Sequence, residues 1–144
     1  KVLDVGCGKS FLLHELKLLE PELEIMGFDI SEYALENNKE TTKPFVYYQK
    51  AQDKYKYKDK EIDLVISLHV IHSLRFFDLK RALKEISRVG KQAYVVVESY
   101  RNENELVNLQ CWATVCECFF DVDEWIYLFK DFSYTGDYEF VFFE

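Results

Sequence analysis

The feature that most constrains the fold of this sequence is the regular return of short apolar runs along the chain. The runs that favour buried β-strands are Val2–Val5, Leu23–Phe28, Phe45–Tyr48, Ile62–Ser67 and Ala93–Val97. Runs that are apolar at almost every position are typical of parallel strands covered on both faces. We therefore predict an α/β fold, with a doubly wound, mostly parallel sheet and helices on both faces.

Helical patterns separate these runs. Ser10 is expected to cap a helix that continues to Glu20 and stops at Pro21. A second helix is expected to begin at Ser31. Further helices are expected at about 77–88, where Gly90 would end the helix, within 101–120 and at 121–130, with a last strand at 138–143. Trp112 and Trp125 are expected in the core. The alternation of strands and helices supplies the crossovers that a parallel sheet needs.

The length of 144 residues suits one domain, covering residues 1–144. Lys1 already lies inside a strand pattern, so we expect the domain to be incomplete at its N-terminus. No run is long and apolar enough for a membrane span and no signal peptide opens the chain, so no membrane partner is expected. The oligomeric state is left open.

Charge and cysteine usage restrict the partners and the compartment. The chain has 18 Lys and Arg against 26 Asp and Glu, a net charge of −8. Such a surface argues against nucleic-acid binding, and the basic run at 54–58 is interpreted as a solvated loop. Cys111, Cys116 and Cys118 form no C-x₂-C pair, so no metal site is expected. We interpret the compartment as reducing and cytoplasmic.

A glycine turn follows the first strand. Gly6 and Gly8, on either side of Cys7, let the backbone turn sharply and let a ligand approach closely. Asp29 closes the second strand, where a carboxylate can accept hydrogen bonds from ribose hydroxyls. A dinucleotide fingerprint would need a third glycine at the position of Phe11, which disfavours a nicotinamide cofactor. Asp4 suits a ligand that carries an ammonium group.

The stretch Leu3-Asp-Val-Gly-Cys-Gly8 resembles motif I of the class I S-adenosylmethionine-dependent methyltransferases, with Ser10 in place of the last glycine. Gly27-Phe-Asp-Ile-Ser31 resembles motif II, and 49–53 resembles the segment after the third strand, with Lys50 at its acidic position. The resemblance implies a Rossmann-like fold with S-adenosyl-L-methionine as cofactor. The residues that it implies for the cofactor site are Asp4, Gly6, Cys7, Gly8, Asp29, Ile30, Ala51, Gln52 and Ser67.

Two histidines follow the fourth strand. The stretch 67–74 is similar to a segment of the small-molecule branch of this family, in which His72 matches the first of a histidine pair. Histidine can act as a general base near neutral pH, so His72 and His69 are the candidate catalytic residues. The alternative is that both form structural hydrogen bonds. Glu98 and Tyr100 lie at the same edge, and Tyr100–Phe120 is a hypothetical wall of the acceptor pocket.

The resemblance implies an enzyme that moves a methyl group from S-adenosylmethionine to a small-molecule acceptor. The acceptor, and whether its oxygen, nitrogen or carbon is methylated, stay open. Two other functions share the same scaffold: a non-catalytic S-adenosylmethionine-binding module within a complex, and a transferase of the aminopropyl type. A nicotinamide oxidoreductase is the third alternative.

Overall fold

The computed structural model describes residues 1–144 and contains one sheet of six strands. The strands are β1 (Val2–Val5), β2 (Ile25–Asp29), β3 (Val46–Tyr48), β4 (Ile62–Leu68), β5 (Gly90–Glu98) and β6 (Asp137–Val141). Their order is β3-β2-β1-β4-β5-β6, and every neighbouring pair is parallel. The predicted doubly wound sheet is confirmed. Its order reverses between β1 and β4, where sheets of this kind bind ligands.

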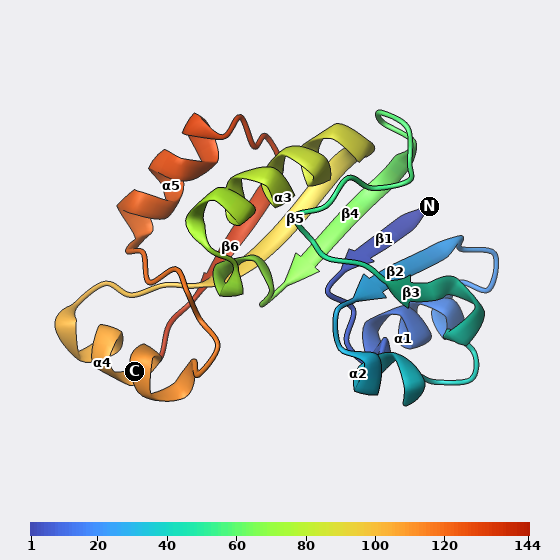
Figure 1. Cartoon of the computed structure of the whole chain (residues 1–144), viewed down its shortest axis with the longest axis horizontal. Helices are drawn as coiled ribbons and strands as arrows, with labels where there is room; N and C mark the ends of the chain where they lie inside the picture. The colour runs from blue at the N-terminus through green and yellow to red at the C-terminus, as the bar shows by residue number, and fades with distance from the viewer.

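Helices connect most of the strands (Figure 1). They are α1 (Phe11–Leu19), α2 (Glu32–Glu36), α3 (Phe76–Val89), α4 (Glu103–Trp112) and α5 (Val122–Asp131), with short 3₁₀ turns η1 (Lys43–Phe45) and η2 (Ile71–Ser73). None of these helices combines the length and the apolar character that crossing a membrane requires.

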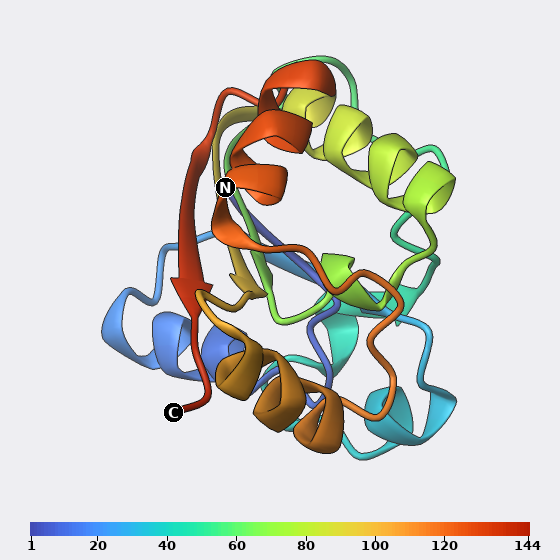
Figure 2. The same cartoon turned by 90° about the vertical axis from the view of Figure 1, so that its left-hand side faces the viewer.

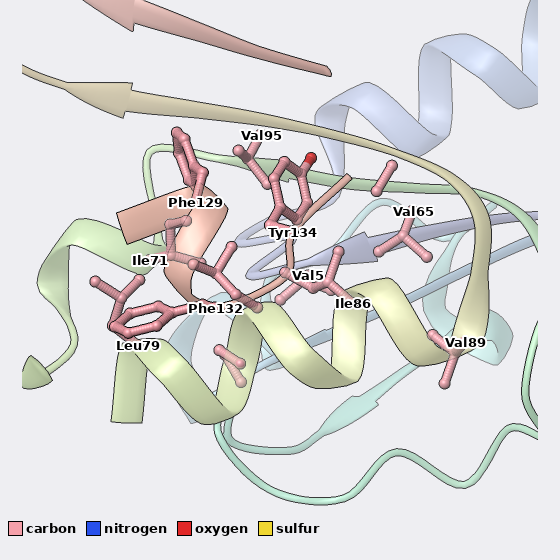
Figure 3. Packing of buried hydrophobic residues seen from close by; sticks show 14 of the residues in the cluster. Val5, Val65, Ile71, Leu79, Ile86, Val89, Val95, Phe129, Phe132 and Tyr134 are labelled. Carbon is pink, nitrogen blue, oxygen red and sulfur yellow. The ribbon is translucent and has the colours of Figure 1, made fainter. Parts of the chain in front are cut away.

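The two faces of the sheet are covered unequally. A cluster of 23 buried residues joins α3 and α5 to one face, and Figure 3 shows Leu79, Ile86 and Val89 of α3 packed among side chains of this cluster. On the other face α1 buries only a small cluster of Cys7, Leu13 and Ile25. Figure 2 shows α1 on the opposite side of the strands from α3 and α5. The expectation of helices on both faces is thus confirmed.

The connection between β3 and β4 contains no helix. It carries the basic run, in which the lysines at 54, 56 and 58 are exposed while Tyr55 and Tyr57 are buried. Arg88 of α3 donates hydrogen bonds to the carbonyl oxygens of both tyrosines, and Glu85 accepts one from the N–H of Tyr55. The two tyrosines therefore pack into the core beneath this loop, and the lysines form its solvent-exposed side.

Two local expectations were wrong, whereas Gly90 ends α3 as expected. Ser10 precedes α1 but has a left-handed backbone (φ +56°), and its hydroxyl bonds the sulfur of Cys7 instead of capping the helix. Trp112, expected in the core, is 59% exposed and stacks on Phe143.

Candidate functional site

A cavity of about 530 Å³ lies at the carboxyl ends of β1, β2 and β4. This volume is within the range of small-molecule pockets. The residues named from the sequence that line it are Gly6, Asp29, Ile30, Ala51, Gln52 and His69. A smaller depression of about 260 Å³, lined by Lys60, Gly90 and Asp137 among others, lies at the opposite ends of the strands. Because ligands bind beyond the carboxyl ends in such sheets, the larger cavity is the candidate site.

The glycine turn after β1 contributes Gly6 to the lining of this cavity. Gly6 and Gly8 have φ values of +79° and +52°, in the left-handed region that glycine adopts without strain. A Cβ at Gly6 would lie 2.3 Å from Cγ2 of Val70, so the turns after β1 and β4 touch here. A Cβ at Gly8 would meet nothing within 4 Å. The turn is therefore closed at Gly6 and open at Gly8.

Asp29 is held by backbone donors on both sides. The N–H of Gly8 donates to its Oδ2 at 2.8 Å, and the N–H of Ser31 donates to its Oδ1 at 2.8 Å. A carboxylate oxygen has a second lone pair, so both oxygens can accept a further bond from a ligand hydroxyl. The side chain is thus fixed in orientation at the edge of the cavity.

Asp4 is a buried carboxylate without a cationic partner. It lies on β1 and is 5% exposed. Burial, and after it the charge of Asp29, raise the pKa of Asp4 to about 7. No opposing charge or donor lowers it, so the group ionises readily only when a cation is brought to it.

The other residues named from the sequence lie outside the cavity lining. Cys7 is buried beneath the turn, and burial raises the pKa of its thiol to about 12. The hydroxyl of Ser67 donates to the carbonyl oxygen of Val5 at 3.3 Å and joins β4 to β1. Asp4, Gly8 and His72 are also absent from the lining. Cys7 and Ser67 are thus buried residues that stabilise the turn and do not contact the cavity.

His69, His72 and Glu98 form a cluster beside the cavity. Oε1 of Glu98 lies 2.8 Å from Nδ1 of His69, and Oε2 contacts Nδ1 of His72. The side chain of Glu98 is fully buried, that of His72 is 4% exposed, and that of His69 is 46% exposed. Burial alone would raise the pKa of Glu98, but His72 and then His69 outweigh it and hold this pKa below its ordinary value.

This cluster separates the two candidate bases. His69 lines the cavity, whereas His72, which the sequence analysis placed first, is enclosed in the fold. No group of three or more His, Cys, Asp or Glu side chains in the chain is arranged to hold a metal ion.

Some residues of the cavity wall were missed from the sequence. Val70, Ser73 and Leu74 line it from the turn after β4, and Val115 lines it from the loop after α4. Of the hypothetical acceptor wall Tyr100–Phe120, Val115 is the residue that reaches the cavity. The family resemblance of the stretch 67–74 could have indicated these residues. The apolar side chains within it have no chemical group that marks them as site residues.

Comparison with known proteins gives a family match over most of the chain. The family described as "Methyltransferase domain" matches residues 1–133. The mitochondrial arginine-hydroxylase NDUFAF5 of Mus musculus is 32% identical over 115 residues, which are 80% of this chain and 33% of that protein. The chain therefore spans about a third of the length of this curated relative.

Solved structures share the fold. The S-adenosylmethionine-dependent methyltransferase of Archaeoglobus fulgidus is 24% identical and superposes with a TM-score of 0.71 over 91% of this chain and 59% of that one. The Haloferax volcanii methyltransferase in complex with the Trm112 methyltransferase activator is 21% identical, with a TM-score of 0.72 over the same shares, 91% and 59%. At these identities the likeness concerns the fold alone.

Proposed function

The chain belongs to the methyltransferase-domain family and has the class I fold, and from that premise we propose that it binds S-adenosylmethionine and methylates a small-molecule acceptor. The observation that carries the proposal is that Asp29 accepts a hydrogen bond from the glycine turn, and that Gly6 and Asp29 both line a cavity large enough for a small molecule. When bound, the cofactor supplies a methyl group on a sulfonium sulfur.

The residues around the turn fit this cofactor. Asp29 is oriented to accept hydrogen bonds from the two ribose hydroxyls. Asp4, buried and without a cation, suits the ammonium of the amino-acid end. Ala51 and Gln52 line the same cavity beyond β3, where they can contact the adenine, with Ile30 beside them. Gly8 leaves open space for the ligand to approach the backbone.

Calorimetry with S-adenosylhomocysteine tests this proposal. The Asp29→Ala variant should bind about 10- to 100-fold more weakly, the loss expected for charge-assisted hydrogen bonds. Asp53→Ala removes an exposed carboxylate of the neighbouring loop and serves as the matched control. No binding by the wild-type chain, or equal binding by both variants, would overturn the assignment.

The acceptor is proposed to be a small molecule because the cavity is of that size and the surface is acidic. His69 is the proposed base, since its imidazole lines the cavity and that of His72 does not. The Haloferax volcanii neighbour acts beside an activator protein, so an assay should include cell extract as well as the isolated chain.

A second candidate function comes from the curated relative, which is named an arginine-hydroxylase. The match with this relative covers 80% of the chain. The two functions differ in the mass that they add to an acceptor. A product heavier by one methylene unit favours methyl transfer, and a product heavier by one oxygen atom favours hydroxylation.

A further inference from the structure

We propose that Glu98 is a positioning residue, which holds His69 in a single tautomer so that its Nε2 faces the cavity as the base for an acceptor that must lose a proton. This inference rests on the proposed function and specifies the class of acceptor that the site takes. The acceptor carries a hydroxyl or a protonated amine at the atom that receives the methyl group.

The first support is the geometry of Glu98. Its carboxylate ends β5, is fully buried, and has the two imidazoles as its ion-pair partners, with no Lys or Arg. Nδ1 of His69 lies 2.8 Å from Oε1, so an ionised Glu98 requires that this nitrogen carry the proton. The proton-free nitrogen of neutral His69 is then Nε2, to which no group of the chain is hydrogen bonded.

The second support is the backbone of His69. Its φ of +58° lies in the left-handed region, which is strained for a residue with a side chain. Its N–H still donates to the carbonyl oxygen of Val96 at 3.0 Å, as the last bond that joins this turn to β5. Strain of this kind gathers where a side chain must point in a particular direction. Here it turns the imidazole toward Glu98 and the cavity.

His72 holds the other side of the carboxylate. Its Nδ1 lies within ion-pair distance of Oε2 of Glu98, although neither atom forms a hydrogen bond. The carbonyl oxygen of His72 accepts from the N–H groups of Glu117 and Cys118, at 3.1 and 3.0 Å. The backbone of His72 is therefore fixed, and its ring lies against the oxygen of Glu98 that does not face His69.

Few other titratable groups face this cluster. Cys116 approaches from the loop after α4, and burial, followed by the charges of Glu98 and Glu117, raises the pKa of its thiol. The thiol therefore stays neutral and supplies no charge. The tautomer of His69 is left under the control of Glu98.

The proton balance of the step is simple. Nε2 of His69 takes the proton from a hydroxyl as its oxygen forms the bond to the methyl carbon. From an ammonium group it takes the proton first, which frees the nitrogen lone pair that then attacks the methyl carbon. The electron pair of the broken carbon–sulfur bond stays on sulfur, which loses its positive charge. His69 becomes an imidazolium, whose Nδ1–H remains bonded to the carboxylate of Glu98, and it later returns the proton to water.

Nitrogen-15 NMR of the imidazole rings tests this arrangement in the full chain. The three histidines are assigned with His14→Asn, His69→Asn and His72→Asn variants. At a pH where the rings are neutral, wild-type His69 should show a protonated Nδ1 and a proton-free Nε2. In Glu98→Gln the opposite tautomer should rise about tenfold or more, because a charge-assisted hydrogen bond to the carboxylate is lost. Glu139→Gln, an exposed acid on β6, should change nothing.

The wild-type spectrum decides the outcome even if Glu98→Gln fails to fold. A proton on Nε2 of His69 would overturn the proposal, and so would an unchanged tautomer ratio in a folded Glu98→Gln. S-adenosylhomocysteine should shift the Nε2 signal of His69 more than that of His72. If calorimetry shows binding without that shift, His69 is not the base; if calorimetry shows no binding, the proposed function fails while the tautomer result stands.

Discussion

Two buried carboxylates on strands of the sheet, Asp4 and Glu98, have pKa values shifted in opposite directions. Asp4 on β1 is 5% exposed, and its pKa is raised to about 7 by burial and by the charge of Asp29. Glu98 at the end of β5 is 1% exposed, yet its pKa is lowered, because two histidines outweigh the effect of burial. The depth of burial is nearly the same, so the difference comes from the partners that the chain supplies.

The difference distinguishes two walls of the site, one formed around β1 and β2 and one formed around β4 and β5. The buried carboxylate of the first wall has no cationic partner in the chain, whereas that of the second wall has two histidines. In the β1–β2 wall, Gly6 and Asp29 line the cavity while Asp4 is buried outside the lining, and neither carboxylate has a cation of the chain beside it. In the β4–β5 wall, two histidines are the ion-pair partners of Glu98, and the ring of His69 lines the cavity. The losses of stability in variants of the two walls should therefore differ in size.

The largest effect is expected for Glu98→Ala. This change leaves two imidazoles beside an empty buried space, and breaking a buried charged pair costs about 3–5 kcal/mol of the free energy of unfolding. Denaturant unfolding measures it. Asp4→Ala should cost far less at pH 8, since it removes a buried charge that nothing balances. Equal losses in the two variants would contradict the contrast between the walls.

The second largest loss of stability is expected where the two walls touch, at Gly6 and Val70. Gly6→Ala places a Cβ 2.3 Å from Val70 in a left-handed backbone, and we expect a loss of about 2–4 kcal/mol in unfolding free energy. Gly8→Ala meets no atom and should lose only about 1 kcal/mol from its backbone conformation. A loss in Gly8→Ala that equals the one in Gly6→Ala would show that Val70 does not matter.

Asp4 should make the chain sensitive to pH. Its folded pKa of about 7 lies above its ordinary value of 3.8, so between these values the folded state holds the extra proton. The free energy of unfolding of the unliganded chain should therefore fall as the pH rises from about 4 to 7 and then level off. Asp4→Asn should flatten this dependence.

Ligand binding should show the opposite trend. An ammonium group favours ionised Asp4, so affinity for S-adenosylhomocysteine should rise by up to about tenfold per pH unit below pH 7. Above about pH 8 the ligand's own amino group loses its proton, and the gain should end. Calorimetry at pH 5.5 and 7.5, with Asp4→Asn as the control, measures the effect. A slope that persists in Asp4→Asn would assign it to another group.

Much of the fold could be predicted from the sequence, because its signals are local. The strands, the main helices and the turn at Gly6 and Gly8 each depend on a few neighbouring residues. The errors fell where a side chain meets a partner outside its own helix. Ser10 bonds Cys7 of the glycine turn rather than the helix end, and Trp112 stacks on Phe143.

The residues of the site also fall into two groups, those that a sequence motif can identify and those that only the folded sheet brings together. Gly6 and Asp29 lie in motifs, and a sequence pattern can place them at one cavity. The pairing of Glu98 with His69 and His72 joins residues 26 to 29 positions apart, through strands that become neighbours only in the folded sheet. The family resemblance placed His72 first, and nothing in the sequence shows that the ring of His72 is buried while that of His69 is exposed.

The smallest effect is expected for Arg101, which belongs to neither wall. It lies in the segment Tyr100–Phe120, the hypothetical wall of the acceptor pocket, but its guanidinium binds Glu105 and Glu144 and lies over the ring of Phe142. Arg101→Ala should change the affinity for S-adenosylhomocysteine and the use of an acceptor by less than about 0.5 kcal/mol, as surface changes do. Val115→Asp, from the same segment, puts a charge into the cavity wall and should weaken acceptor use more strongly. Turnover of labelled S-adenosylmethionine and calorimetry compare the two variants. If Arg101→Ala impairs acceptor use as much as Val115→Asp does, the acceptor extends beyond the cavity toward α4, and the wall of the site must be drawn to include Arg101.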